Sequence, residues 1–408
     1  MKSPFVLGSL LLPLVSQAVI ASSSHGDVVG KVVAGYQGWF SIKEDTNDPN
    51  HAWTHWGDGT TNSVGVEVWP DVREYASTYQ WDTNATLGNG KKATLYDSYD
   101  TQTVDVHFSW MKKYGIDVAA VQRFGTDALG SNTKDHVNGV AHKAQAAAEK
   151  HGVKFYIMWD ISGWTNFTTD LPTDFLNTVK NFTSSPAYAR QNGKPVVNVW
   201  GLGLLDRPGT PDQAMTVINF LKDQGLYVIL GVPTLWLTQA DSKLTGFLPV
   251  YTAADMISPW SVGRYNGTDG AAAYQVQLKY DLTYCKEHGI DYQPVVFPGM
   301  AWSNWTPGAV KNMIPRLKGA FLWQQFVNLR KLGIPNAYIA MFDEYNEGTA
   351  IAKAAEDSSM IPTNQYFLTL DADGAHLSSD FYLRVAGDGG RLLKHQIPLS
   401  TKVPTSYK

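Results

Sequence analysis

The chain has 408 residues, of which 33 are Lys or Arg and 37 are Asp or Glu, so its formal net charge is −4. This balance excludes the polycationic character that binds nucleic acid or an anionic membrane non-specifically. Hydrophobic residues make up 44% and charged residues 17%, which is typical of a folded globule and not of a disordered chain. The single cysteine, Cys285, excludes an intrachain disulfide and a cysteine-based metal cluster.

The N-terminus has the layout of a secretory signal peptide. Lys2 precedes a short apolar run over residues 5–14, which Pro13 interrupts, and small residues at 16, 18 and 21 suit cleavage. We expect residues 1–21 to be removed and residues 22–408 to form one secreted, extracellular domain, with a cytosolic protein as the alternative. A glycosylated product is favoured by five Asn-X-Ser/Thr sequons, which begin at Asn84, Asn166, Asn181, Asn266 and Asn304.

From residue 32 onward, apolar β-branched runs alternate with amphipathic stretches. The predicted strands are Val32–Tyr36, Val118–Gln122, Lys154–Trp159, Pro195–Val199, Tyr227–Val232, Met256–Pro259, Tyr292–Phe297 and Ala337–Phe342. The predicted helices are Val104–Tyr114, Lys134–His151, Pro172–Phe182, Pro211–Gln224, Ala271–His288 and Phe321–Leu332. Five of these helices are followed by a glycine that suits a helix end: Gly115, Gly152, Gly225, Gly289 and Gly333.

The order of these elements predicts an α/β fold. Strands that are almost continuously apolar are buried on both faces, and are therefore parallel. Eight of them alternating with helices favour a single-domain (β/α)8 TIM barrel with long βα loops over an open sheet. A dinucleotide-binding fold would need Gly-X-Gly-X-X-Gly after the first strand, and this chain has Gly-Tyr-Gln-Gly-Trp-Phe there. After residue 357 we expect a polar tail whose segment 366–374 forms the last helix or a strap across the barrel.

Tryptophan is concentrated where the predicted strands end. In a barrel the loops after the strands converge on one face, where active sites form. Indole planes stack on the C–H face of a pyranose ring, so a cluster of them favours a sugar-binding platform over indoles that only cap the core. Eight of the 14 tryptophans occupy such positions: Trp39, Trp159, Trp164, Trp200, Trp236, Trp260, Trp302 and Trp305.

Two glutamates after the eighth predicted strand indicate the reaction class. Glycoside hydrolysis needs two carboxyl groups in different protonation states, and Glu344 and Glu347 are spaced i, i+3. In a continuing strand these side chains would face opposite sides, but Asn346 and Gly348 indicate a turn that lets both point into the barrel mouth. We predict Glu347 as the general acid/base, with a pKa raised by apolar surroundings, and Glu344 as the partner base.

Other residues at strand ends are candidates for binding the sugar. His51 and His55 have the i, i+4 spacing of a metal-binding pair, but they lie in a Gly- and Asp-rich loop, so we predict no metal and no cofactor. The absence of a Gly-X-Ser-X-Gly motif disfavours a serine hydrolase, and Cys285 is expected to pack in a helix. The predicted binding residues are Tyr36, Trp39, His55, Trp56, Gln122, Arg123, Trp159, Asp160, Trp200, Trp260, Trp302, Asp343 and Tyr345.

Several segments together resemble a known group of proteins. The chain resembles secreted proteins of glycoside hydrolase families 71 and 99 over roughly residues 30–352, through "VVAGYQGWFS", "HAWTHWG", "WMKKYGIDVAAVQRF" and, most specifically, "FDEYNEGTAI". Family 99 segments similar to the last one carry two glutamates three residues apart, which match Glu344 and Glu347. Asn346 stands where family 99 usually has His.

The resemblance implies a retaining α-glycosidase. In family 99 the first glutamate deprotonates the sugar 2-hydroxyl to form an anhydro-sugar, and the second protonates the leaving oxygen and then activates water. Family 71 enzymes of similar layout cut α-1,3-glucan. We therefore predict a secreted, monomeric glycoside hydrolase that acts on a polysaccharide or glycan. A non-catalytic, lectin-like carbohydrate-binding barrel is the alternative, and an extracellular protein–protein module that uses the aromatic face is a third.

Overall fold

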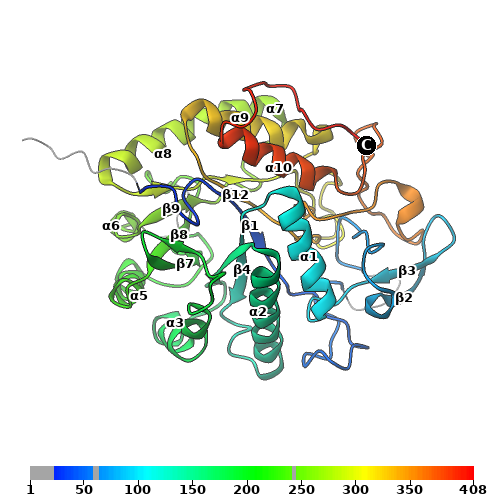
Figure 1. Ribbon diagram of the computed structural model, residues 1–408, viewed down its shortest axis with the longest axis horizontal. Coiled ribbons are helices and arrows are strands. Elements are labelled where there is room, and N and C mark those ends of the chain that lie inside the picture. Colours follow the sequence, from blue (N-terminus) through cyan, green and yellow to red (C-terminus); the bar gives the residue numbers. More distant parts are fainter. Residues whose placement is uncertain (1–22, 58–63, 241–244) are drawn as a thin grey trace, which may run out of the picture.

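The computed structural model describes residues 23–57, 64–240 and 245–408, so the predicted signal peptide lies outside the described residues. At its centre, parallel strands pair in the order β10-β9-β8-β7-β5-β4-β1-β12-β11 (Figure 1). These strands are β1 (Val32–Tyr36), β4 (Val118–Phe124), β5 (Lys154–Asp160), β7 (Lys194–Trp200), β8 (Tyr227–Val232), β9 (Met256–Pro259), β10 (Asp291–Tyr292), β11 (Val295–Val296) and β12 (Ala337–Ile339). A short strand, β6 (Arg190–Gln191), pairs antiparallel with β7.

The seventh barrel strand consists of two halves, β10 and β11. β10 pairs with β9 and β11 pairs with β12, with only Gln293 and Pro294 between the halves. The backbone N–H of Gln293 donates to Ile257 and the carbonyl of Pro294 accepts from Tyr338, both at 2.9 Å, so the two residues between the halves still bond to the neighbouring strands. Because β1 pairs with both β4 and β12, the ring has eight strand positions. The predicted (β/α)8 TIM-barrel class is confirmed.

Helices surround the barrel (Figure 1). They are α1 (Thr101–Tyr114), α2 (Ser131–His151), α3 (Phe167–Asp174), α4 (Lys180–Phe182), α5 (Pro211–Asp223), α6 (Leu248–Thr252), α7 (Gly267–Ala273), α8 (Gln275–His288), α9 (Ala320–Leu332) and α10 (Phe381–Leu393). The predicted helix at 172–182 is instead α3 and α4 joined by a π-helical turn over Phe175–Val179. Among the described helices, none combines the length and hydrophobicity needed to span a bilayer.

The long first loop leaves the barrel and forms a small hairpin. Strands β2 (Trp81–Thr86) and β3 (Lys92–Leu95) pair antiparallel within it. Residues 359–363 run along this hairpin: the N–H of Gly88 donates to the carbonyl of Ile361 at 3.0 Å, and the N–H of Thr363 donates to the carbonyl of Thr86 at 3.2 Å. Segment 366–374 is not the last helix, which is α10; the N–H of Leu368 donates to the carbonyl of Glu67 at 2.7 Å, so this segment lies along the first loop. In Figure 1, α10 lies beside α9.

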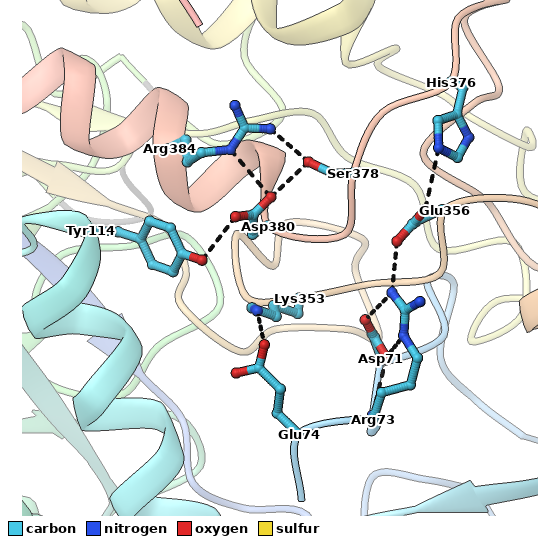
Figure 2. A network of polar contacts seen from close by, with 10 residues as sticks. All are labelled: Asp71, Arg73, Glu74, Tyr114, Lys353, Glu356, His376, Ser378, Asp380 and Arg384. Atoms are coloured by element: carbon cyan, nitrogen blue, oxygen red, sulfur yellow. Dashed lines mark hydrogen bonds and ion pairs between the residues drawn. The ribbon is translucent and has the colours of Figure 1, made fainter. Parts of the chain in front are cut away.

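Polar contacts fix the chain after the eighth strand to the rest of the protein (Figure 2). Arg73 lies between Asp71 at 2.7 Å and Glu356 at 2.6 Å, and so joins the first loop to the tail. Lys353 pairs with Glu74 in the same loop. At the start of α10, Asp380 accepts hydrogen bonds from Tyr114 on α1 and from the α10 residue Arg384, and both residues lie beside it in Figure 2. The segment that carries the glutamate pair is therefore anchored on its C-terminal side.

Candidate active site

A hollow of about 160 Å³ opens at the carboxyl ends of the barrel strands. Its polar lining includes Gln37, Gln122, Asp160 and Arg207, together with both glutamates of the eighth loop. A more open hollow of about 440 Å³ adjoins it, because the two share Trp200, Arg207, Trp260 and Glu347. Together they form a continuous surface at the face where TIM barrels carry their chemistry.

The loop after β12 folds back on itself and brings Glu344 and Glu347 to the same side. The carbonyl of Glu344 accepts from the N–H groups of Thr349 at 3.1 Å and Ala350 at 2.8 Å, so the chain reverses between them. Gly348 has a φ of +63°, a left-handed conformation that glycine adopts without strain. The turn that the sequence predicts between the two glutamates is present, and both line the hollow.

Glu344 is buried and held by three donors. Its Oε2 accepts from the side-chain amide of Gln37 at 3.0 Å, and its Oε1 accepts from the backbone N–H groups of Asn346 at 2.8 Å and Glu347 at 3.2 Å. Burial raises the pKa of Glu344 well above its ordinary value, and the nearby charge of Glu347 raises it further, while the hydrogen bonds act against both. These donors fix the carboxylate in one orientation.

Glu347 is half-buried, and its carboxyl group has no hydrogen-bond partner among the residues that the structure describes. Burial raises its pKa, and the positive charge of Arg207 offsets part of that effect. Two carboxyl groups that share one hollow titrate as a pair, in which ionisation of one disfavours ionisation of the other. In such a pair one carboxyl group can keep its proton while the other is ionised, which is the arrangement that acid–base chemistry needs.

Asp343 supports the site from behind. Its carboxyl accepts from the backbone N–H groups of Gln37 at 2.7 Å and Gly38 at 2.9 Å, and burial raises its pKa to about 7. Asp343 is fully buried and is not among the described residues that line the hollow. Its side chain therefore does not lie where the predicted sugar-binding role would need it. It joins the eighth strand to the first loop, which carries Gln37 and Trp39.

Several of the predicted binding residues do meet at the site. Trp39, Gln122, Asp160, Trp200 and Trp260 line the first hollow, and Trp302 lines the second. Trp200 and Trp260 pack edge to face with ring centroids 5.3 Å apart. An indole has flat apolar faces and a polar N–H at its edge. It can therefore stack on the C–H face of a sugar ring while its edge meets polar groups. The two hollows are therefore walled by indoles next to carboxyl groups.

His55 contributes through Trp39. Its ring stacks on the Trp39 indole at 3.7 Å with an interplanar angle of 6°. Burial lowers the pKa of His55 to about 3, so the imidazole is neutral at physiological pH. His55 is not part of the described lining of either hollow. Its ring instead packs against the Trp39 indole and supports it.

Arg123 and Trp159 were predicted to bind the sugar but point away from the hollow. In the register of the sheet Gln122 lies beside Met158, and Arg123 beside Trp159. Successive side chains of a strand face opposite sides, so Gln122 and Met158 face the hollow while Arg123 and Trp159 face the helices. There, Arg123 pairs with Asp174 at 2.5 Å and the Trp159 indole N–H donates to Asp174 at 2.8 Å.

Tyr36, Trp56 and Tyr345 were also predicted as binding residues, and all three are buried in the core. The Tyr36 hydroxyl bonds to His107 at 3.0 Å, the Trp56 indole N–H donates to the carbonyl of Tyr96 at 2.9 Å, and the Tyr345 hydroxyl donates to the carbonyl of Lys353 at 3.0 Å. Their polar atoms are thus satisfied inside the protein. These aromatic side chains form the packing beneath the loop and are not among the described residues of the hollow.

The tryptophan cluster divides between the two roles that the sequence left open. Trp39, Trp200, Trp260 and Trp302 line the hollows. The others behave differently: Trp159, Trp164 and Trp236 are buried, and Trp305 is 53% exposed.

Some lining residues were not among the predicted ones. Met158 and Tyr338 form part of the lining, and Met158 could have been found because it precedes Asp160 by two residues and shares its face. Gln37 directly follows β1 and also lies at the site. Arg207 lies in the loop after β7, with its guanidinium 5.1 Å from the Trp200 ring. Because it lies beyond the end of the strand, the alternation of side chains along the strand could not have predicted it.

The architecture is similar to that of solved structures. The structure titled GH99 endo-alpha-mannosidase from Bacteroides thetaiotaomicron superposes with a TM-score of 0.67 and 15% identity, over 90% of this chain and 98% of that one. This chain has the same fold. A glycoside hydrolase-like protein superposes with a TM-score of 0.53 and 15% identity, over 94% of this chain and 97% of the other. No family model and no curated protein matches the sequence. At this identity the likeness concerns the fold.

Proposed function

We propose that the protein is a secreted glycoside hydrolase that cleaves an α-glycosidic bond of a polysaccharide or glycan. The observation that carries this proposal is the meeting of Glu344 and Glu347 in one indole-walled hollow at the carboxyl end of the barrel. The shared fold with a family 99 endo-α-mannosidase supports it. The resemblance of the eighth-strand segment to family 99 supplies the assignment of the two roles.

Glu347 suits the role of acid. Its carboxyl group lies in the hollow without a hydrogen-bond partner among the described residues, and its pKa is raised, so it can hold a proton and give it to the leaving oxygen. As the C1–O bond breaks, the oxygen of the leaving sugar takes this proton. Later the Glu347 carboxylate takes a proton from water, which then attacks C1.

Glu344 suits the role of base. Three donors orient its carboxylate, and its raised pKa makes it a stronger base than an exposed glutamate. It takes the proton of the sugar 2-hydroxyl, whose oxygen closes on C1 to form an anhydro-sugar. When water opens that ring, Glu344 returns the proton to O2. Both glutamates end in their starting states, and two inversions at C1 give net retention.

The rest of the hollow binds the sugar in this proposal. Trp39, Trp200 and Trp260 supply flat apolar surfaces, and Gln122 and Asp160 supply polar groups for hydroxyls. Asn346 takes no part, because its side-chain amide donates to the backbone carbonyls of His55 at 2.5 Å and Gly65 at 3.3 Å. It holds the first loop against the eighth.

The proposal is tested with the purified protein on α-glucans and α-mannans, with xylans and arabinans as further substrates, and with product anomers followed by NMR. Glu347→Gln should lower kcat by at least about 10³-fold on the best substrate while sugar still quenches tryptophan fluorescence. The control is Glu287→Gln, an exposed glutamate on α8, which should retain full activity. Wild-type protein that binds a glycan but turns over none of these substrates would identify a lectin-like barrel instead.

A further inference from the structure

The asparagines of the five sequons differ in what their side chains do in the folded protein. N-glycosylation needs a free side-chain nitrogen, because that nitrogen forms the bond to the sugar. A sequon whose amide hydrogens are already used inside the fold therefore differs from one whose amide lies in solvent. Asn304 is half-buried, and the other four asparagines are exposed: Asn84, Asn166, Asn181 and Asn266.

Both amide hydrogens of Asn304 are used inside the protein. Its Nδ2 donates to the carbonyl of Val66 at 2.8 Å and to the carbonyl of Tyr366 at 2.7 Å. A carbonyl oxygen can only accept, so the atom that faces these two groups is the nitrogen of the amide and not its oxygen. A sugar bonded to this nitrogen would replace one of the two hydrogens and would need space that a carbonyl now fills. A glycan and these two contacts therefore exclude one another.

The rest of this sequon does not reveal the conflict. Trp305 is 53% exposed and Thr306 is exposed as well, so two of the three residues of the motif are accessible. The asparagine alone binds the first loop and segment 366–374 through its amide. Neither the motif nor the exposure of its neighbours separates this sequon from the other four.

Asn304 belongs to a junction of three segments: the first loop, the loop after β11 and segment 366–374. Glu67 of the first loop is fully buried at this junction. Its carboxylate accepts from the Ser303 hydroxyl at 2.9 Å and from the backbone N–H of Asn304 at 3.1 Å. The Asn304 amide joins the third segment to the other two, so the junction depends on it.

The junction supports the loop that carries the glutamate pair. The backbone N–H of Glu67 donates to the carbonyl of Tyr345 at 2.9 Å, and the N–H of Ala301 donates to the carbonyl of Glu347 at 2.9 Å. Both carbonyls belong to the loop after β12. A glycan at Asn304 would separate the segments that hold this loop, so an unmodified Asn304 is a condition of the candidate active site.

The other four sequons place the asparagine in solvent. Asn166 precedes α3 and Asn266 precedes α7, and neither side chain caps its helix with a hydrogen bond. Asn84 lies in β2 and Asn181 in α4, and both are exposed. Figure 1 shows β2, α3 and α7 in separate parts of the molecule. Glycans at these positions would leave the packing of the described residues intact.

We propose that the protein carries N-glycans on the four exposed asparagines and that Asn304 stays unmodified, because its amide binds the carbonyls of Val66 and Tyr366. This inference rests on secretion, which is part of the proposed function. In the modification, Nδ2 loses one proton and bonds to C1 of a sugar, while the lipid pyrophosphate that carried the sugar leaves. A chain that received a glycan at Asn304 before folding could not close the junction and would not reach this fold.

The first test locates the glycans. The full-length chain is expressed with its own N-terminus in a eukaryotic secretory host, and the secreted protein is treated with an N-glycanase in heavy-oxygen water. This converts each glycan-bearing asparagine into a labelled aspartate, which peptide mass spectrometry detects. We expect label at the four exposed asparagines and none at Asn304. Label at Asn304 in protein that unfolds cooperatively overturns the inference, as does an unlabelled asparagine among the other four.

The pattern also separates this inference from the proposal beneath it. A secreted protein with label at Asn304 leaves secretion intact and refutes only the assignment of the sites. A chain without any label that stays inside the cell contradicts secretion itself, and the inference fails with it.

The second test uses matched variants. Thr86→Val and Thr306→Val each remove the hydroxyl of one sequon and keep its asparagine. Thr86→Val should lower the mass of the protein by one glycan, whereas Thr306→Val should change neither the glycan mass nor Tm. Loss of one glycan in Thr306→Val would show that Asn304 is a used site and would overturn the inference.

Asn304→Asp tests the role of the amide. It also removes the sequon, but it places an acceptor where the two carbonyls need a donor, so Tm should fall by about 2–5 °C relative to Thr306→Val. An unchanged Tm would show that the junction does not depend on this amide and would remove the reason for an unmodified Asn304. If Asn304→Asp is not secreted, the mass of Thr306→Val still decides whether this sequon is used.

Discussion

The side-chain amide of Gln37 donates a hydrogen bond to Glu344, with 3.0 Å between Nε2 and Oε2. Gln37 directly follows the first barrel strand and Glu344 follows the last, so this bond joins the two ends of the ring. It favours the ionised form of Glu344 against the burial that opposes ionisation. The other described amide of the hollow, Gln122, donates instead to the Tyr338 hydroxyl at 3.1 Å.

Gln37→Leu should shift the pH dependence of the proposed hydrolysis. Without this donor the pKa of Glu344 rises further, so the acidic limb of the kcat/KM profile should move to higher pH. Steady-state kinetics across pH on the best substrate measure this. Gln122→Leu serves as the control, because it removes an amide of the same hollow that does not contact either glutamate. It should change KM and leave the limb in place, and a limb unmoved in Gln37→Leu would contradict the prediction.

Gly348→Ala should reduce activity more than its loss of stability explains. Alanine at a φ of +63° costs about 1–2 kcal/mol, and its Cβ would lie 3.2 Å from the carbonyl oxygen of Ala301, so the loop beside Glu347 must move. Gly90→Ala is the matched control, with a φ of +81° and no atom within 4 Å of the added Cβ. Thermal unfolding and kcat should show similar stability losses in both variants but an activity loss in Gly348→Ala alone. Equal activity in the two would refute this.

Asp174→Ala should destabilise the protein without altering the site. It removes the partner of Arg123, whose side chain is 2% exposed, and also the acceptor of the Trp159 indole N–H. A buried cation left unpaired costs about 3–5 kcal/mol, which urea unfolding would measure. Asp82→Ala removes the partner of Lys92 in an exposed pair and should leave the unfolding free energy unchanged. KM should be the same in all three proteins below their melting temperatures.

Asp281→Asn should flatten the dependence of stability on pH. Burial raises the pKa of Asp281 from its ordinary 3.8 to about 7, although Tyr292 and Gln277 donate hydrogen bonds to it. The folded state therefore holds a proton that the unfolded state has lost, so stability is greatest below about pH 4 and falls as pH rises to about 7. The fall from this residue is on the order of 4 kcal/mol.

Tm measured from pH 4 to pH 7 tests this sign. The wild type should lose more stability over that range than Asp281→Asn does. Asp269→Asn, at an exposed position on α7, should follow the wild-type curve. An Asp281→Asn curve that runs parallel to the wild type would show that this carboxyl group does not titrate as its burial implies.

Much of the fold could be predicted because its determinants are local. Three strands, β1, β8 and β9, begin and end where the sequence predicts, since runs of apolar β-branched residues define them. Helix ends could also be predicted from glycine. The residues Gly115, Gly152, Gly289 and Gly333 follow helices and have φ values of 66–77°, which other residues rarely adopt. The seventh strand was found as one run although the structure divides it at Gln293 and Pro294.

The glutamate pair could be located for the same reason. Its position depends on where the eighth strand ends and on the turn that Gly348 allows, and both are encoded within a few residues. The sugar-binding residues were predicted less well. Gln122 and Arg123 are neighbours in the chain and were both chosen, yet one lines the hollow and the other pairs with Asp174.

The sequence by itself determined the strand order, the helix ends and the place of the carboxyl groups. Only the tertiary structure decided which side of each strand faces the hollow. A strand buried on both faces has no polar side that marks which residues point inward, so the sequence does not show whether Asp160 or Trp159 faces the hollow. In the structure, Asp174 of helix α3 lies beside Trp159 and accepts its indole N–H, which places Trp159 on the helix side of the strand. The place of Arg207 at the hollow was also decided only by the tertiary structure. Arg207 lies in a loop, where no periodic sequence pattern shows which way a side chain points.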